Sequence, residues 1–479
     1  MFYLMSGVKV LLFLLFTTFV VYGGALWMEK VRKNAPSRKA AKATNKKILL
    51  AEALINFGIL FILKYYNFIA ENIDSLFGVF RYHFSMPLVN LVLPLGISFY
   101  TFQAVGYSID VYRGKTKAEK NFFQFALFIS FFPQMTQGPI SRYHDLAPQL
   151  KEGHSFSLKN LKFGMELVLW GYFKKLVIAD RAGMVVSQVF GNPHHYDGLQ
   201  VLTAMGLYAI QIYTDFSGGI DMTRGIAEAM GIHLVDNFRQ PYFGNTLSEY
   251  WRRWHMSLTN WMRDYVFFPL TFAHFSNKIG KWGRKHLGPI GKQLPAYIPT
   301  FVTFMLIGIW HGAGWGFIVF GLYNSCIIIL SMAFTPLFKI WKKALHINEK
   351  SFLWRVFQIV RTFLILVYGK TITRAGSLSD AFWMMRRTFT INTRQIALLH
   401  PQLTALGLSG KEWLALFLAF CVLFTVSVLR EKGISIRESV AAKPAAVRWV
   451  LILGLLAVVL IFGVYGEGYS SSNFVYRNF

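Results

Sequence analysis

His311 is the residue whose position in this chain most strongly suggests chemistry. It lies 14 residues into the apolar run 297–336, which places it about 20 Å along a helix. An imidazole can transfer a proton or attack an electrophile, and an ionisable side chain at such a depth indicates a functional site. The structural alternative is a neutral histidine that is hydrogen-bonded to a neighbouring helix. Glycines at 308, 312, 314 and 316 would allow a ligand to approach the backbone closely.

His255 lies in a second segment, 251–258, which is rich in aromatic and basic residues. Helical spacing would place four residues of this segment on one face: Trp251, Trp254, His255 and Leu258. We predict that His255 assists the same site as His311, whereas a satisfied histidine on a core-facing interfacial helix is the alternative. Arg252 and Arg253 would then face water and could bind phosphate, although arginines at an interface also contact lipid headgroups.

Carboxylates stand in or beside apolar runs at Asp110, Asp215 and Asp221. A carboxylate buried in a membrane requires a partner, and three arginines are the candidates: Arg113, Arg142 and Arg224. Two roles therefore stay open for Asp215. It could belong to a structural ion-pair network, which is the favoured interpretation, or it could help to bind the substrate or donor.

Metal and nucleotide chemistry have no recognisable motif in this chain. No segment resembles a phosphate-binding loop, a dinucleotide fingerprint, a nucleophile elbow or a histidine-rich metal site. The two cysteines, Cys326 and Cys421, both lie in apolar runs, which argues against zinc or a structural disulfide. We therefore expect histidine-centred chemistry with no metal and no permanently bound cofactor.

The elements that position these residues are predicted to be apolar helices. Hydrophobic residues make up 54% of the 479 residues and charged residues only 15%, and the mean hydropathy is +0.40. This composition excludes a soluble enzyme, a disordered chain and a disulfide scaffold. Runs that could span a bilayer occur at 5–27, 48–70, 87–109, 122–138, 163–190, 199–222, 297–336, 352–369, 412–429 and 447–466.

These runs predict an all-α polytopic membrane protein with about ten or eleven transmembrane helices. The run 297–336 is long enough for two of them, and Pro133 makes 122–138 a broken or re-entrant helix. The segment 236–295 is too polar to span and too aromatic for an ordinary loop, so we expect short interfacial helices there. The small, basic segment 35–44 is expected to be a loop.

Basic segments set the expected orientation in the membrane. The formal net charge of +27 would suggest nucleic acid in a soluble protein, but here it collects in short loops, as cytoplasmic loops do. Segments 29–47, 339–355 and 430–448 are therefore predicted to be cytoplasmic. Both termini and the segment 373–411 are then extracytoplasmic. We expect membrane lipid as a partner and no nucleic acid.

Residues 248–265, followed by Gly-Ile-Trp-His-Gly at 308–312, resemble the signature of the membrane-bound O-acyltransferase (MBOAT) family. Four further segments resemble its bacterial AlgI-like and DltB-like branch: 94–103, 110–115, 130–140 and 471–474. The resemblance implies an MBOAT-type ring of helices around a central tunnel, in a single membrane domain 1–479. Residues 1–90 would form N-terminal spans, 90–335 the core and 336–479 C-terminal spans. It also implies that His311 is catalytic and that His255 supports it.

The resemblance also implies a reaction. An acyl group would leave a cytoplasmic thioester donor, acetyl-CoA or alternatively an acyl-carrier-protein thioester, near the basic region 239–292. It would cross the bacterial cytoplasmic membrane for O-acylation of an extracytoplasmic polysaccharide or cell-wall polymer, with an SGNH-like or DltD-like partner. Pro269 resembles the AlgI-like sequences and favours acetyl, and D-alanyl transfer to teichoic acids is the alternative. Trp310 or Asn260 could support the oxyanion. A transporter or flippase is disfavoured because no repeated halves are visible.

Overall fold

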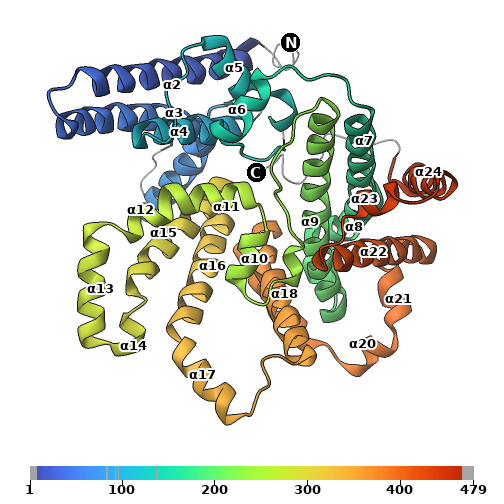
Figure 1. Cartoon of the computed structure of the whole chain (residues 1–479). Coiled ribbons are helices and arrows are strands. Elements are labelled where there is room, and N and C mark those ends of the chain that lie inside the picture. Colours follow the sequence, from blue (N-terminus) through green and yellow to red (C-terminus); the bar gives the residue numbers. More distant parts are fainter. Residues whose placement is uncertain (1–7, 82–84, 92, 95, 136, 466–479) are drawn as a thin grey trace. The chain divides into compact units, whose positions relative to one another are not determined.

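The computed structural model of the chain describes residues 8–81, 85–91, 93–94, 96–135 and 137–465. Every regular element among these residues is a helix and none is a strand, which confirms the predicted all-α fold (Figure 1). The segment 471–474 and the tail from 467, which we predicted to be extracytoplasmic, lie outside the described residues.

Among the described residues, seven helices are long and apolar enough to cross a membrane. They are α2 (Val8–Asn34), α3 (Arg38–Val79), α15 (Leu294–His311), α16 (Trp315–Ala333), α18 (Phe352–Arg374), α22 (Gly410–Glu431) and α24 (Ala445–Phe462). The two predicted spans of the run 297–336 are α15 and α16. The other apolar runs form helices that are shorter, interrupted or richer in polar residues, and the ten or eleven expected spans stay a prediction.

Those other runs form five helices. α4 (Ile97–Arg113) has 17 residues, and α5 (Phe122–Ser130) stops where the 3₁₀ turn η1 (Phe132–Gln134) begins, at the predicted break around Pro133. The π-helical turn η2 (Phe173–Ala179) joins α7 (Leu158–Tyr172) to α8 (Asp180–Gly191) and carries two lysines. α9 (Gly198–Ala229) has 32 residues, Asp215 and Asp221 among them.

Contacts between helices divide the chain into two compact units. Of the described residues, the first unit contains those up to Leu161, Ala227–Val235 and Gly312–Gly314, and the second contains Lys162–Ile226, Asp236–His311 and those from Trp315 onwards. Within the first unit, α4 packs on α2 and α3. The single membrane domain 1–479 with its sections 1–90, 90–335 and 336–479 stays a prediction.

The first unit is built on α2, α3 and α4. Its core holds fully buried aromatic side chains, among them Tyr100, Tyr107 and Phe125. The segment 35–44 is not the predicted loop, because α3 begins at Arg38. The Ser37 side chain accepts a hydrogen bond from the Ala40 amide (3.1 Å), which satisfies one of the open N–H groups of the first turn and starts the helix early.

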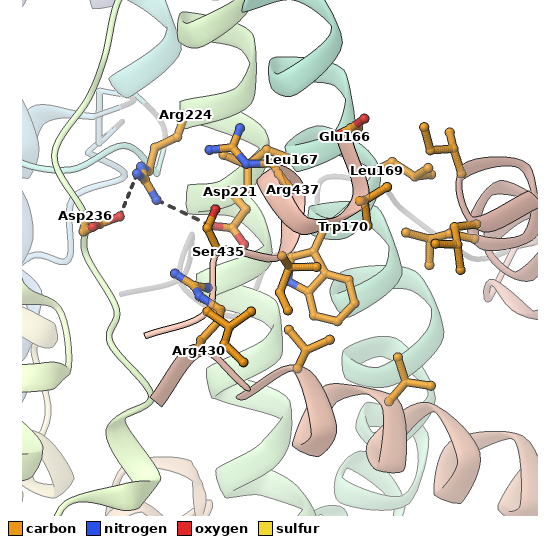
Figure 2. Close-up of a pocket in the computed structure, with 18 of the residues that line it drawn as sticks. Glu166, Leu167, Leu169, Trp170, Asp221, Arg224, Asp236, Arg430, Ser435 and Arg437 are labelled. Carbon is orange, nitrogen blue, oxygen red and sulfur yellow. Dashed lines mark ion pairs between the residues drawn. The ribbon is translucent and has the colours of Figure 1, made fainter. Parts of the chain in front are cut away.

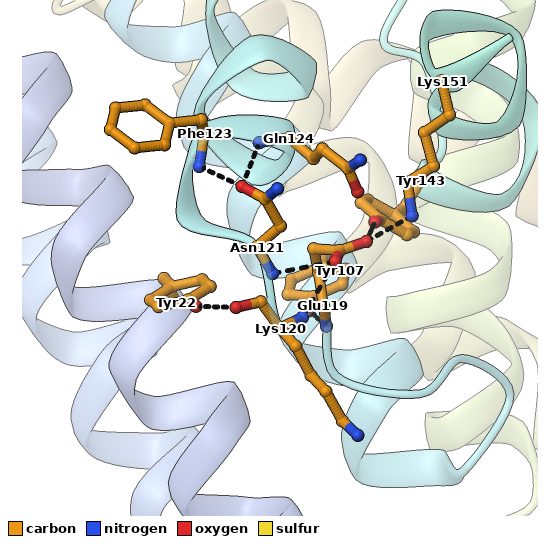
Figure 3. A network of polar contacts seen from close by, with 9 residues as sticks. All are labelled: Tyr22, Tyr107, Glu119, Lys120, Asn121, Phe123, Gln124, Tyr143 and Lys151. Carbon is orange, nitrogen blue, oxygen red and sulfur yellow. Dashed lines mark hydrogen bonds and ion pairs between the residues drawn. The ribbon is translucent and has the colours of Figure 1, made fainter.

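A polar network around Glu119 joins α4, α5 and α6 (Tyr143–Lys151) in this unit, as Figure 3 shows. The Glu119 carboxylate accepts hydrogen bonds from Lys151 and Tyr143, and the Glu119 amide donates to the Tyr107 hydroxyl (2.8 Å). Burial raises the pKa of Glu119, but these hydrogen bonds and the Lys151 charge outweigh burial and lower it to about 2. Asn121 then caps α5 through its side chain.

In the second unit, the aromatic segment 236–295 forms only short helices, as predicted. They are η4 (Pro241–Phe243), α10 (Leu247–Arg253), α11 (Met256–Met262), η5 (Arg263–Phe267), α12 (Phe268–Thr271), α13 (His274–His286) and α14 (Gly288–Gly291). Further short helices of the unit are η3 (Pro193–His195), α17 (Thr335–Ala344), α19 (Leu378–Arg387), η6 (Thr388–Thr390), α20 (Thr393–Ala397), α21 (Leu399–Thr404) and α23 (Ile436–Ala441). The long helices α9, α15, α16 and α18 carry most of the residues of the site described next.

Candidate active site

His311 is the last residue of α15 and is only 7% exposed. Its ring contacts the rings of Trp310 (5.0 Å between centroids) and Phe320 (6.1 Å). α15 packs closely against α16 because both helices present glycine at their crossing. A Cβ atom on Gly308 would lie 2.4 Å from the carbonyl oxygen of Phe317, so only glycine allows this approach.

His255 does not lie within a continuous helix, so the predicted helical face through 251–258 is wrong. α10 ends at Arg253, and His255 adopts a left-handed backbone conformation (φ +44°) just before α11. The four residues of that predicted face are nevertheless all buried: Trp251, Trp254, His255 and Leu258. A left-handed histidine is uncommon, and helical periodicity alone cannot anticipate it.

Asn237 holds this break in place. Its backbone carbonyl accepts from the Met256 amide (2.9 Å), and its side-chain Oδ1 accepts from the Ser257 amide (2.9 Å). These are N–H groups of the first turn of α11, which the His255 side chain does not cap. Asn237 therefore supplies, from outside the helix, the acceptors that an N-cap residue normally provides.

The same Asn237 Oδ1 lies 3.2 Å from Nδ1 of His255. Because a carbonyl oxygen only accepts, Nδ1 is the donor, and the lone pair of the neutral ring is on Nε2. Burial lowers the pKa of His255 to about 3, so the ring is neutral near pH 7. The His255 side chain, which is 1% exposed, therefore has a fixed orientation and a fixed tautomer.

Trp310 contacts both motif histidines. Its ring centroid lies 5.7 Å from that of His255 and 5.0 Å from that of His311. On its other side, His255 meets the edge of Phe216 on α9 (4.9 Å). The structure thus brings His255 and His311 into one aromatic cluster, with the Trp310 indole in contact with both.

A small cavity adjoins His311. Its volume is about 20 Å³, which is room for about one water molecule. The residues that line it are Ile212, Trp251, Trp254, His311, Phe317, Phe320, Lys370 and Thr373. Trp251 is fixed there by a hydrogen bond from its Nε1 to Asn324 Oδ1 (3.0 Å).

Lys370 on α18 is a cavity residue that the sequence analysis missed. It is 5% exposed, and its Nζ lies 3.9 Å from the ring centroid of Trp254 and 5.7 Å from that of Tyr250. This geometry is that of a cation–π contact. The sequence feature that could have indicated Lys370 is its place at the end of the apolar run 352–369. An ionisable residue in a membrane helix indicates a functional site by default.

Asp215 belongs to a buried network whose partners differ from those predicted. Its carboxylate pairs with Lys175 (2.7 Å), which also pairs with Asp180 (2.8 Å), while Asp221 pairs with Lys174 (2.7 Å). The π-helical turn η2 presents both lysines towards α9. Of the predicted arginines, Arg224 does approach Asp221, at 4.0 Å. The sequence did not reveal the two lysines, because they lie inside an apolar run about 40 residues away.

The remaining predicted site residues, Arg252, Arg253 and Asn260, are not among the described residues that line the cavity. Arg252 is exposed, whereas Arg253 pairs with Glu249 (2.7 Å) and Glu431 (2.8 Å). Asn260 on α11 is half-buried. Within the described part of the chain, no group of three or more His, Cys, Asp or Glu side chains could hold a metal ion.

Comparison with known proteins identifies the family to which the chain belongs. Residues 117–282, which include His255 and Asp215, match MBOAT, the membrane-bound O-acyltransferase family. The "Probable alginate O-acetylase AlgI" of Pseudomonas putida is 32% identical over 373 residues, which cover 78% of this chain and 71% of that protein. The chain belongs to the MBOAT family. Its multi-pass membrane character follows from this membership and from the seven apolar helices.

Two relatives with other names are also similar to this chain. The "Peptidoglycan O-acetyltransferase" of Helicobacter pylori is 29% identical, over 60% of this chain and 55% of that protein. The "Teichoic acid D-alanyltransferase" of Bacillus subtilis is 28% identical, over 59% of this chain and 69% of that protein. The matched part of this MBOAT chain spans 66% of the length of two further Pseudomonas AlgI proteins, just under two thirds.

Proposed function

We propose that this chain is a membrane-bound O-acyltransferase of the bacterial cytoplasmic membrane. It moves an acyl group from a cytoplasmic thioester donor towards an extracytoplasmic polymer. Acetyl is the first candidate for this acyl group. The observation that carries the proposal is the position of His311, at the end of a membrane helix and beside a cavity that it shares with Lys370. An imidazole that is nearly excluded from water suits acyl transfer, because water would hydrolyse the thioester.

The proposed chemistry has two forms, and His311 is central in both. As a general base, its ring accepts the proton of an acceptor hydroxyl while the hydroxyl oxygen bonds to the acyl carbon. The C–S bond breaks, and the thiolate takes the proton from the imidazolium. As a nucleophile, the ring nitrogen bonds to the acyl carbon and releases the thiolate. The acceptor oxygen then displaces the imidazole, and the hydroxyl proton passes to the thiolate. Either form needs a group that stabilises the oxyanion.

Lys370 is the proposed oxyanion-stabilising group. An amino group donates N–H hydrogen bonds, and Lys370 lines the same cavity as His311. Trp310 remains a second candidate, since its ring contacts that of His311. Asn260 is a weaker candidate than either, because it does not line this cavity in the described structure.

The acetyl group is proposed ahead of D-alanine because the more similar relatives include proteins named alginate O-acetylase. Acetyl-CoA is then the donor. D-alanyl transfer from a carrier protein is the second candidate, supported by the teichoic acid D-alanyltransferase relative. A separate extracytoplasmic protein of the SGNH-like or DltD-like kind is proposed to complete the transfer, because a large polymer cannot enter a cavity of about 20 Å³.

Two donors and two variants test this function. Purified protein in lipid nanodiscs receives either radiolabelled acetyl-CoA or a D-alanyl carrier protein, and release of the acyl group is measured. We expect His311→Gln to lower the rate by about 10²–10⁴ while expression and thermal stability stay normal, because glutamine cannot accept a proton near pH 7. His255→Gln should lose less. Full activity of a well-folded His311→Gln protein would exclude the catalytic assignment, and turnover of the D-alanyl donor alone would select the second candidate.

A further inference from the structure

A second and much larger cavity lies in the second unit, lined by other residues than those around His311. Its volume is about 530 Å³. Its walls come from α7, α9, α22, α24 and the segment around α23, as Figure 2 shows. The proposed transfer reaction uses none of its residues, and the two ends of the cavity differ in chemistry.

One end is polar and carries an excess of positive charge. Arg224, Arg430 and Arg437 line it together with Glu166, Asp221 and Asp236 (Figure 2). Two lysines behind the wall pair with its carboxylates: Lys162 with Glu166 and Lys174 with Asp221. Each of the three lining carboxylates thus has a basic partner, since Asp236 pairs with Arg224, and the lining residues Arg430 and Arg437 add further positive charge. Such an excess in a partly enclosed site favours an anion with one or two negative charges.

The three arginines of the cavity differ in the ion pairs and hydrogen bonds that they already make within the protein. Arg224 pairs with Asp236 (2.6 Å), and Arg437 donates to the carbonyl oxygen of Phe163 (2.9 Å). Arg430 is the exposed last-turn residue of α22, and no hydrogen bond or ion pair is found for it in the described part of the chain. Guanidinium groups bind phosphate oxygens with two parallel N–H donors, so Arg430 is the natural contact for a phosphate.

The other end of the cavity is apolar. Trp170 on α7, Val422 on α22 and Leu451 and Leu455 on α24 form this wall. Only 17% of the apolar stretch of α22 and 6% of that of α24 is buried inside the protein. The remaining surface of these two helices therefore faces the hydrocarbon of the membrane. The apolar wall therefore continues into the surface that contacts lipid chains.

We infer that this cavity binds an anionic phospholipid, whose phosphate lies at Arg430 and Arg437 and whose acyl chains lie along α22 and α24. A phosphate beside apolar walls is the chemistry of a phospholipid, and continuity with the lipid-facing helices favours a lipid over a soluble phosphate ester. The predicted orientation places the segment 430–448 on the cytoplasmic side, where anionic lipids attract basic segments. The inference concerns lipid recognition and does not depend on the acyl-transfer proposal.

Native mass spectrometry of the full chain tests the lipid assignment. Protein from nanodiscs of phosphatidylglycerol and phosphatidylcholine is examined as wild type, as Arg430→Gln and as Arg430→Gln with Arg437→Gln. We expect retained phosphatidylglycerol to fall about tenfold in the double variant, since it loses charge-assisted hydrogen bonds. Lys432→Gln is the matched control, because Lys432 is exposed on the same segment and does not line the cavity. It should retain lipid as the wild type does.

Two further measurements keep the test decisive. Because Arg437 also bonds to α7, Leu455→Trp fills the apolar end without touching the arginines, and it should lower lipid retention as well. Inorganic phosphate and coenzyme A are added in separate arms as soluble phosphate compounds. Equal lipid retention in wild type, double variant and Leu455→Trp would overturn the inference. Displacement of the lipid by micromolar coenzyme A would assign the cavity to a soluble phosphate ester and would also overturn it.

Discussion

Lys370 is the cavity residue whose replacement should most directly report on transition-state stabilisation. We predict that Lys370→Met lowers acyl transfer by about 10²–10³, the loss typical of removing an oxyanion donor. Lys370→Arg keeps N–H donors near Trp254 and should lose less. The measurement is the rate of acyl release in nanodiscs, with melting temperature as the control for folding. Wild-type rates in a stable Lys370→Met protein would assign this lysine to packing against Trp254 alone.

The contrast between His311 and Lys370 shows what a sequence reveals about a site at the level of single residues. His311 could be singled out because its own surroundings, a long apolar run with glycines, are informative. Lys370 gave a local signal too, as a lysine at the end of the run 352–369, but its contact with Trp254 joins separate segments of the chain, as does the contact of Asn237 with His255. Such contacts depend on tertiary packing, which a local pattern does not contain.

At the level of elements, the sequence predicted apolar helices well and their interruptions poorly. The runs that became α15, α16, α18, α22 and α24 follow from hydropathy alone. The break between α10 and α11 depends instead on the backbone of a single residue, His255, and on acceptors supplied by Asn237. The π-helical turn η2 also places Lys174 and Lys175 in the interior of the protein. The burial of these two charged side chains could not be predicted from the sequence.

The orientation of the helices is testable with single cysteines. The native Cys326 and Cys421 are first replaced by alanine, because both are free and exposed. We predict that an impermeant thiol reagent on intact cells labels Ser472→Cys, which lies outside the described residues, and leaves Ser37→Cys unlabelled. The reason is the positive charge of 29–47 and 430–448, which is expected to hold those segments in the cytoplasm. Labelling of position 37 with protection of position 472 would reverse the orientation.

The Glu119 network predicts a pH dependence of stability. Its folded pKa of about 2 lies below the usual 4.5, so the carboxylate stabilises the fold above about pH 4.5 and loses this contribution as the pH falls towards 2. We expect the melting temperature of the purified wild type to decline over this range. Glu119→Gln should be less stable than the wild type at neutral pH, and the difference should shrink on acidification. Parallel curves for the two proteins would show that Glu119 does not control this transition.

At the scale of the whole molecule, the proposed transfer to a polymer through a second protein would need a docking surface. The segment 373–411 carries α19, on which Phe382 is 55% exposed. The ring of Trp383 beside it contacts the ring of His194 in a tilted arrangement (4.3 Å between centroids), and His194 also bonds to Asp380 (3.1 Å). A helix with an exposed aromatic side chain is suited to docking a partner, and a simple interfacial helix is the alternative.

Phe382→Glu tests this surface. We predict that it abolishes co-purification with the extracytoplasmic protein encoded by a neighbouring gene and lowers polymer acylation in cells. Acyl release from the donor by the purified chain should not change. Phe352→Glu is the control, because Phe352 is also exposed. It lies at the N-terminal end of α18, whereas α19 with Phe382 follows the C-terminal end of α18. Polymer acylation by the chain alone, with no partner present, would remove the need for a docking surface.

The small volume beside His311 also bears on the energy supply of the cell. A protein that passes chemical groups through a bilayer risks a proton leak, which would dissipate the transmembrane voltage. The cavity of about 20 Å³ holds about one water molecule between aromatic walls, and a single water cannot form a hydrogen-bonded wire for protons. A resting cavity of this size would therefore oppose a proton leak at this point. Its opening for a substrate would require the rings of Trp251, Trp254 and Phe320 to move apart.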